Sequence, residues 1–116
     1  MPRVSCPSRG DVVWLDFDPQ VGHEQAGRRP AMVLSHREYN LKTGLAIVCP
    51  MTSKVDKPWP FMVHVAADSA AIADQVKCVD WRGRRAEIKA HVADDVLEQV
   101  ITTFCRIILP AAKYTT

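Results

Sequence analysis

A short segment near the N-terminus, residues 22–30, places one carboxylate and two guanidinium groups close together. Glu24, Arg28 and Arg29 lie within six consecutive residues. Two glycines favour a shaped loop here, and Pro30 is expected to end that loop before an apolar strand. Clustered arginines at the end of a rigid strand can bind a phosphate through paired hydrogen bonds. A surface ion pair in a hairpin loop explains the same residues equally well.

RNA cleavage without a metal has three chemical requirements. The 2′-hydroxyl must lose its proton, the non-bridging phosphate oxygens must be stabilised, and the departing 5′-oxygen must gain a proton. Glu24 is the candidate base, Arg29 the candidate phosphate ligand and Arg28 a second one. Because arginine stays protonated, we assign it an electrostatic role rather than proton transfer.

Thr52 is the third candidate for this chemistry. It follows Pro50 and Met51, just after the apolar run 45–49. Its hydroxyl could hold the same phosphate, provided that this run forms a strand passing beside the loop. Taken alone, Thr52 is more simply explained as a turn residue.

The length of the chain indicates the number of domains, and the distribution of its charges indicates the kind of partner. The chain has 116 residues, of which 47% are apolar, and we expect a single domain spanning 1–116. The formal net charge of +2 does not by itself indicate a binding partner. Lys and Arg residues are, however, concentrated in residues 28–57 and 82–89. If these stretches share a face, that face suits a nucleic acid or another anion, whereas separate stretches would form an ordinary solvated surface.

Metal, cofactor and membrane functions are not expected. The four cysteines form no CxxC pair, and the four histidines show no ligand spacing, so we predict no metal site and no cofactor. No apolar stretch reaches the length of a signal peptide or a membrane span. We therefore expect a reduced, cytoplasmic protein with no membrane contact.

The hydrophobic pattern predicts a mainly β fold. Runs rich in valine and aromatic residues predict short strands at 11–19, 30–35, 45–49, 61–65, 72–76, 78–81 and 87–92. A short helix or turn is expected at 37–42, closed by Gly44. An apolar stripe from Val96 to Ile108 predicts a C-terminal helix that stops before Pro110. Short strands with one terminal helix favour a small curved barrel.

The three tryptophans are candidates for either the core or a binding surface. Trp14 and Trp81 lie within predicted strands, and we expect both in the core. Trp59 lies in a loop between two prolines, where it could stack on a nucleobase or cover an interface.

Seven blocks of the sequence form a specific pattern when they are taken together. They are residues 10–19 (GDVVWLDFDP), 24–31 (EQAGRRPA), 33–35 (VLS), 39–40 (YN), 42–44 (KTG), 50–53 (PMTS) and 73–82 (ADQVKCVDWR). In this order and spacing, from about residue 9 to residue 109, the chain resembles the MazF/PemK family of toxin endoribonucleases.

The resemblance implies an SH3-like barrel of the CcdB/Kid/MazF type that forms a homodimer. It implies sequence-specific, metal-independent cleavage of single-stranded mRNA, which leaves a 2′,3′-cyclic phosphate and a 5′-hydroxyl and thereby inhibits translation and growth. It also implies a cognate antitoxin whose disordered tail folds across the dimer. DNA would be contacted only indirectly, through the antitoxin complex.

Position by position, the resemblance implies a set of site residues. The catalytic residues would be Arg29 and Thr52, assisted by Glu24. Candidate RNA-binding residues are Arg28, Lys54, Gln75, Lys77 and Arg84. His23 departs from the small residue common in the family, and the loop 54–60 is variable, so the recognised RNA sequence does not transfer. Two alternatives stay open: a gyrase-poisoning toxin of the CcdB type, and a non-enzymatic module that regulates its own operon.

Overall fold

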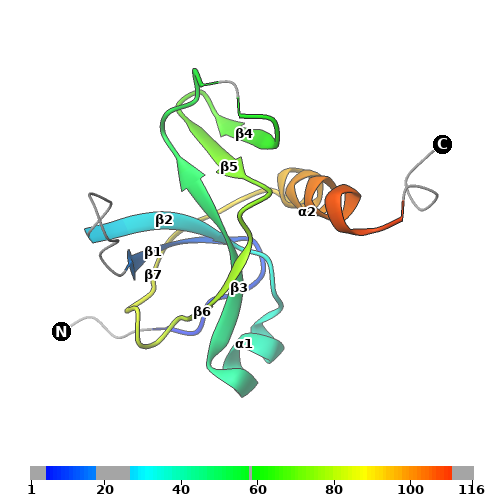
Figure 1. The fold of residues 1–116 in the computed structure, drawn as a ribbon. Coiled ribbons are helices and arrows are strands. Elements are labelled where there is room, and N and C mark those ends of the chain that lie inside the picture. The colour runs from blue at the N-terminus through cyan, green and yellow to red at the C-terminus, as the bar shows by residue number, and fades with distance from the viewer. Residues whose placement is uncertain (1–4, 18–26, 58, 111–116) are drawn as a thin grey trace.

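The computed structural model describes residues 5–17, 27–57 and 59–110, and Figure 1 shows their arrangement. Its strands are β1 (Asp11–Phe17), β2 (Gly27–Val33), β3 (Leu45–Thr52), β4 (Met62–Ala66), β5 (Ser69–Ile72), β6 (Lys77–Asp80) and β7 (Glu87–His91). Its helices are α1 (Arg37–Thr43) and α2 (Asp94–Ile108). The predicted mainly β fold, with a short helix after the second strand and a C-terminal helix, is confirmed. The strand predicted at 72–76 is wrong, since the chain turns after Ile72.

Strand β3 joins two parts of a seven-stranded sheet. The strand order is β4-β5-β3-β2-β1-β7, and β6 also pairs with β3. Residues 45–48 pair with β6, residues 48–50 pair with β2, and residues 51–52 pair with β5, always antiparallel. In Figure 1, β3 runs from α1 at one end to the β4–β5 hairpin at the other. Side chains at the end of β3 therefore lie where the two parts of the sheet meet.

Two hydrophobic cores lie on opposite faces of the central strands. Adjacent residues of a strand point to opposite faces, so Ala31 and Val33 of β2 enter one core and Met32 enters the other. The first core comprises Val13, Leu15, Ala31, Val33, Ala46, Val48, Val79, Trp81 and Ala86. The second comprises Met32, Cys49, Met51, Val63, Ala71, Ala73, Val92, Leu97 and Val100. Helix α2 contributes the last two residues and so packs against the second face.

A buried asparagine ties α1 to the rest of the domain. The Asn40 side chain is fully buried and donates to the Pro7 and Ser35 carbonyl oxygens at 2.9 and 3.1 Å. Its backbone carbonyl accepts the Trp81 indole N–H at 2.8 Å. A buried polar group left unpaired would cost about 1–3 kcal/mol, so this network favours a single placement of α1. The prediction that Trp81 lies in the core is confirmed, since its side chain is 2% exposed.

Helix α2 begins at Asp94, and both Asp94 and Asp95 lie in its first turn, where they complement the helix dipole. The helix runs to Ile108, as the apolar stripe predicted. Within the described ranges, no helix combines the length and the apolar character needed to cross a membrane.

Candidate active site

Two prolines separate β2 from β3 and open the site. Pairing between these strands begins at Ala31 and Pro50 and continues toward α1. If this register continued toward the start of β2, Arg29 would lie opposite Thr52. Thr52 instead pairs with Ala70 of β5. A proline has no backbone N–H to offer to a ladder, and Pro30 and Pro50 stand where the pairing stops. The sequence prediction that Pro50 ends the strand at 45–49 is wrong, because β3 continues to Thr52, and β2 begins at Gly27, before the Pro30 at which the strand was predicted to begin.

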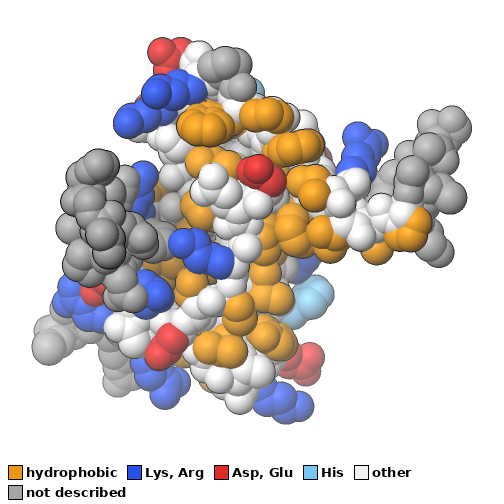
Figure 2. Space-filling view, in the orientation of Figure 1, with side chains coloured by type: hydrophobic (Ala, Val, Ile, Leu, Met, Phe, Trp, Pro, Cys, Tyr) orange, Lys and Arg blue, Asp and Glu red, His pale blue; other side chains and the backbone are white. Residues whose placement is uncertain are grey.

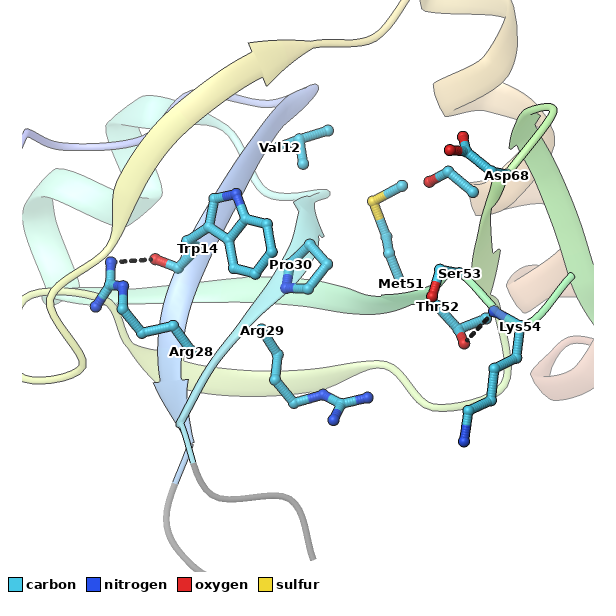
Figure 3. A pocket seen from close by; sticks show the side chains of 11 residues that line it. Val12, Trp14, Arg28, Arg29, Pro30, Met51, Thr52, Ser53, Lys54 and Asp68 are labelled. Carbon is cyan, nitrogen blue, oxygen red and sulfur yellow. Dashed lines mark hydrogen bonds between the residues drawn. The ribbon is translucent and has the colours of Figure 1, made fainter.

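A pocket of about 570 Å³ occupies the place where the strands part. It is lined from β1 and β2 on one side and from the end of β3 and the β4–β5 hairpin on the other (Figure 3). Its lining residues are Val12, Trp14, Arg28, Arg29, Pro30, Met51, Thr52, Ser53, Lys54, Asp68 and Ser69. Three cations against one carboxylate make it a positively charged site, which suits an anion such as a phosphate.

Arg29 and Thr52 approach this pocket from neighbouring strands. The half-buried Arg29 side chain extends from β2 toward the end of β3, and Lys54 lies beyond it (Figure 3). The Thr52 hydroxyl oxygen accepts the backbone N–H of Lys54 at 3.0 Å. Because this contact occupies an acceptor site of the oxygen, it orients the hydroxyl and leaves its proton available for a ligand. Strand β3 pairs with β2, which carries Arg29, whereas most of the loop on which the Thr52 prediction depended lies outside the described residues.

Arg28 turns away from Arg29 and binds protein groups. Its guanidinium donates to the Asp16 carboxylate at 2.8 Å, to the Trp14 carbonyl at 3.0 Å and to the Arg85 carbonyl at 2.7 Å. Arg28 and Asp16 are cross-strand partners in the β1–β2 register. These contacts hold the 82–86 turn against β1 and β2, so Arg28 also fixes the strand that carries Arg29.

The Asp16 carboxylate is the centre of this arginine cluster. Arg85 Nε donates to Asp16 at 2.7 Å, and together with Arg28 it lowers the pKa of the Asp16 carboxyl below its usual value. The pairing therefore stabilises the fold above the ordinary pKa of an aspartate, about 3.9, and is lost as the pH falls through the lowered value. Arg84 donates to the Asp16 carbonyl at 3.1 Å. The two basic stretches thus meet at Asp16.

The other sequence-predicted residues lie in several places. Lys54 is exposed and lines the pocket. Gln75 and Lys77 are exposed near the start of β6 and do not line it. Glu24 and His23 lie outside the described residues.

Trp14 is the functional candidate that the sequence analysis misplaced. The expectation that it lies in the core is wrong, because its side chain is half-buried and lines the pocket. Its neighbours Val13 and Leu15 point into the first core, so strand alternation puts Trp14 on the other face. That alternation was the available signal. Ser53, Asp68 and Ser69 also line the pocket without having been singled out.

Metal-ligating side chains do not cluster in the part of the chain that the structure describes. No group of three or more His, Cys, Asp or Glu residues there could hold a metal ion. The pocket instead offers guanidinium, ammonium, hydroxyl and indole groups, all of which can donate hydrogen bonds.

Comparison with known proteins identifies the family. The sequence pattern of the PemK-like, MazF-like toxins of type II toxin–antitoxin systems matches residues 8–108. The chain is 46% identical to the endoribonuclease toxin MazF of Escherichia coli K12 over 97 residues, covering 81% of this chain and 86% of that protein. It is 31% identical to the endoribonuclease EndoA of Bacillus subtilis over 100 residues, covering 79% of this chain and 85% of that one.

Solved structures agree in fold. A crystal structure of MazE–MazF from Deinococcus radiodurans superposes with a TM-score of 0.80 at 42% identity, covering 90% of this chain and 97% of that chain. A second crystal form of the same complex gives a TM-score of 0.79 at 44% identity. The half-barrel sheet with a C-terminal helix is thus shared with MazF. On its sequence, its fold and the extent of both matches, the chain belongs to the PemK-like, MazF-like toxin family.

Proposed function

We propose that this protein is a metal-independent endoribonuclease that cleaves single-stranded mRNA in the cytoplasm, as the toxin of a type II toxin–antitoxin pair. The observation that carries the proposal is the joint placement of Arg29 and Thr52 in one cationic pocket. The relatives named endoribonucleases support this function over a gyrase-poisoning one, which would require no phosphate site.

In the proposed reaction, the 2′-oxygen of one nucleotide attacks the adjacent phosphorus while the bond from phosphorus to the 5′-oxygen breaks. Glu24 is the candidate acceptor of the 2′-hydroxyl proton, and the leaving 5′-oxygen takes up a proton. Arg29 donates to the phosphate oxygens, whose charge increases in the transition state, and the Thr52 hydroxyl holds the same group in line. The products are a 2′,3′-cyclic phosphate and a 5′-hydroxyl. The proposed RNA contacts are Arg28, Lys54, Gln75, Lys77 and Arg84, of which Arg28 and Lys54 line the pocket.

Primer extension on a defined long RNA tests this function. The purified protein should cut at discrete positions in excess EDTA, because no step requires a metal. The Arg29→Ala variant, purified identically, is the control for contaminating nuclease and should give no such cuts. Cleavage that disappears with EDTA, or an RNA left whole, would contradict the proposal.

A cognate antitoxin is the expected protein partner, since relatives of this chain crystallise as MazE–MazF complexes. The cationic pocket offers the antitoxin a direct means of inhibition, because an acidic or apolar segment placed there would exclude RNA. DNA contact through that complex is part of the same proposal.

We further propose a homodimer. Figure 2 shows apolar side chains gathered in a band from the β4–β5 hairpin along α2 and toward α1. Large apolar residues exposed on α1, at the start of β3 and at the end of α2 are Leu41, Leu45, Ile107, Ile108 and Leu109. A continuous exposed apolar surface marks an interaction site, and a second copy covering it would form a closed pair. Sedimentation equilibrium should give about twice the 13.0 kDa chain mass, and a monomer at micromolar concentration would contradict the dimer.

A further inference from the structure

Trp14 of β1 and Trp81, which follows β6, have opposite environments. Trp81 is 2% exposed, and its indole N–H donates to the Asn40 carbonyl at 2.8 Å. Trp14 is half-buried at the pocket, and among the described residues its indole N–H has no hydrogen-bond partner. A partly buried indole usually finds a partner for this group. Within the described ranges, Trp14 therefore has an aromatic surface at the pocket and an indole N–H that no other described residue accepts.

The surroundings of Trp14 indicate what that ligand is. Its indole lies beside its cross-strand partner Pro30, and both face the space that Arg29 and Thr52 approach from the other side (Figure 3). Pro30 and the Arg28 contact to the Trp14 carbonyl fix the backbone behind the ring. A rigid aromatic ring close to a phosphate-binding cation matches a nucleotide, in which a flat base is attached to a phosphate through one sugar.

We infer that Trp14 is a stacking platform for the base of a nucleotide next to the scissile phosphate, an inference that rests on the proposed ribonuclease function. The ring stacks on the base, and the indole N–H donates to an oxygen of that nucleotide. Trp14 thereby positions the phosphate between Arg29 and Thr52 and takes part in substrate binding rather than in proton transfer. Because every base has a stacking face, this contact fixes the register of the strand more than it selects one base.

The test measures binding separately from chemistry. A single-stranded oligoribonucleotide that spans a mapped cut site, with a 2′-deoxynucleotide replacing the attacking one, cannot be cleaved and reports affinity alone. Trp14→Ala should weaken its binding by about tenfold to a hundredfold, whereas Trp14→Phe should retain most of the affinity. On the cleavable RNA, Trp14→Ala should raise KM more than it lowers kcat. Tyr39→Ala, which removes an exposed aromatic side chain of α1 outside the pocket, should bind as the wild type does.

Abasic substitution distinguishes stacking from a structural effect. Removing one base beside the scissile phosphate should weaken wild-type binding and abolish the difference between wild type and Trp14→Ala. If no abasic position does so, or if the alanine and phenylalanine variants both bind as the wild type does, the inference is wrong. It is also wrong if Trp14→Ala binds RNA normally but escapes the antitoxin or becomes monomeric, because Trp14 would then serve a protein interface. A wild-type protein that cleaves no RNA would instead contradict the proposed function itself.

Discussion

Replacing Arg29 with alanine should slow RNA cleavage by about a hundredfold or more. Arg29 reaches the pocket from β2, where its guanidinium can donate two hydrogen bonds to phosphate oxygens. These bonds strengthen as charge develops on the oxygens, and removing one such donor typically costs a factor of about 10²–10³ in kcat. Single-turnover cleavage of a short RNA with one cut site measures the effect directly.

Arg106→Ala is the matched control, because Arg106 is an exposed arginine on α2 and does not line the pocket. It removes one positive charge without touching the site and should cleave at the wild-type rate. Circular dichroism and the thermal midpoint should show a folded Arg29→Ala protein. Arg29→Lys should recover only part of the rate, since an ammonium cannot reproduce the two-pronged contact. A folded Arg29→Ala variant that cleaves within about threefold of wild type would remove Arg29 from the mechanism.

Thr52→Val should slow cleavage by roughly tenfold to a hundredfold while leaving RNA affinity nearly unchanged. Valine keeps the shape of threonine and removes only the hydroxyl, which the Lys54 N–H orients in the structure. A hydrogen bond to a charged group contributes about 1.5–3 kcal/mol, which corresponds to this range of rates. Single-turnover rates, with binding of the 2′-deoxy oligonucleotide measured alongside, separate the two effects.

Two further variants make the Thr52 result specific. Thr52→Ser retains the hydroxyl and should keep most of the activity. Thr103→Val removes a hydroxyl that donates only within α2, to the Gln99 carbonyl at 2.7 Å, and should cleave normally. If Thr52→Val lost affinity and rate by the same factor, the hydroxyl would act in binding rather than in the transition state.

The elements of this fold were largely predictable from sequence because their patterns are local. Alternation of apolar residues indicates strands, and the stripe ending at Ile108 indicates α2. The end of β3 was misjudged at Pro50, because the rule that a proline stops a strand holds for fully paired strands. Pro50 lies at the last position of the β2–β3 pairing, and Pro30 lies one residue beyond that pairing.

Which of the two arginines pairs with Asp16 could not be predicted from the sequence. Arg28 and Arg29 are chemically identical neighbours, and the loop predicted for both gives no alternation. The structure extends β2 back to Gly27, so the two side chains diverge. Arg28 binds Asp16 because the two residues are cross-strand partners, and that pairing depends on the register between β1 and β2.

Trp14 shows the opposite case, in which the information was present locally. Core-facing Val13 and Leu15 flank it, so the two-residue period of a strand places its ring on the other face. The sequence prediction placed Trp14 in the core because of its residue type and ignored this alternation. Its proximity to the end of β3 still required the tertiary fold.

The central claim is that Arg29 and Thr52 act on one phosphodiester. A crystal structure with the uncleavable 2′-deoxy oligonucleotide tests it most directly. The guanidinium of Arg29 and the hydroxyl of Thr52 should both lie within hydrogen-bond distance, about 2.7–3.2 Å, of oxygens on the scissile phosphate. A scissile phosphate bound elsewhere, or one that contacts only one of these side chains, would contradict the claim.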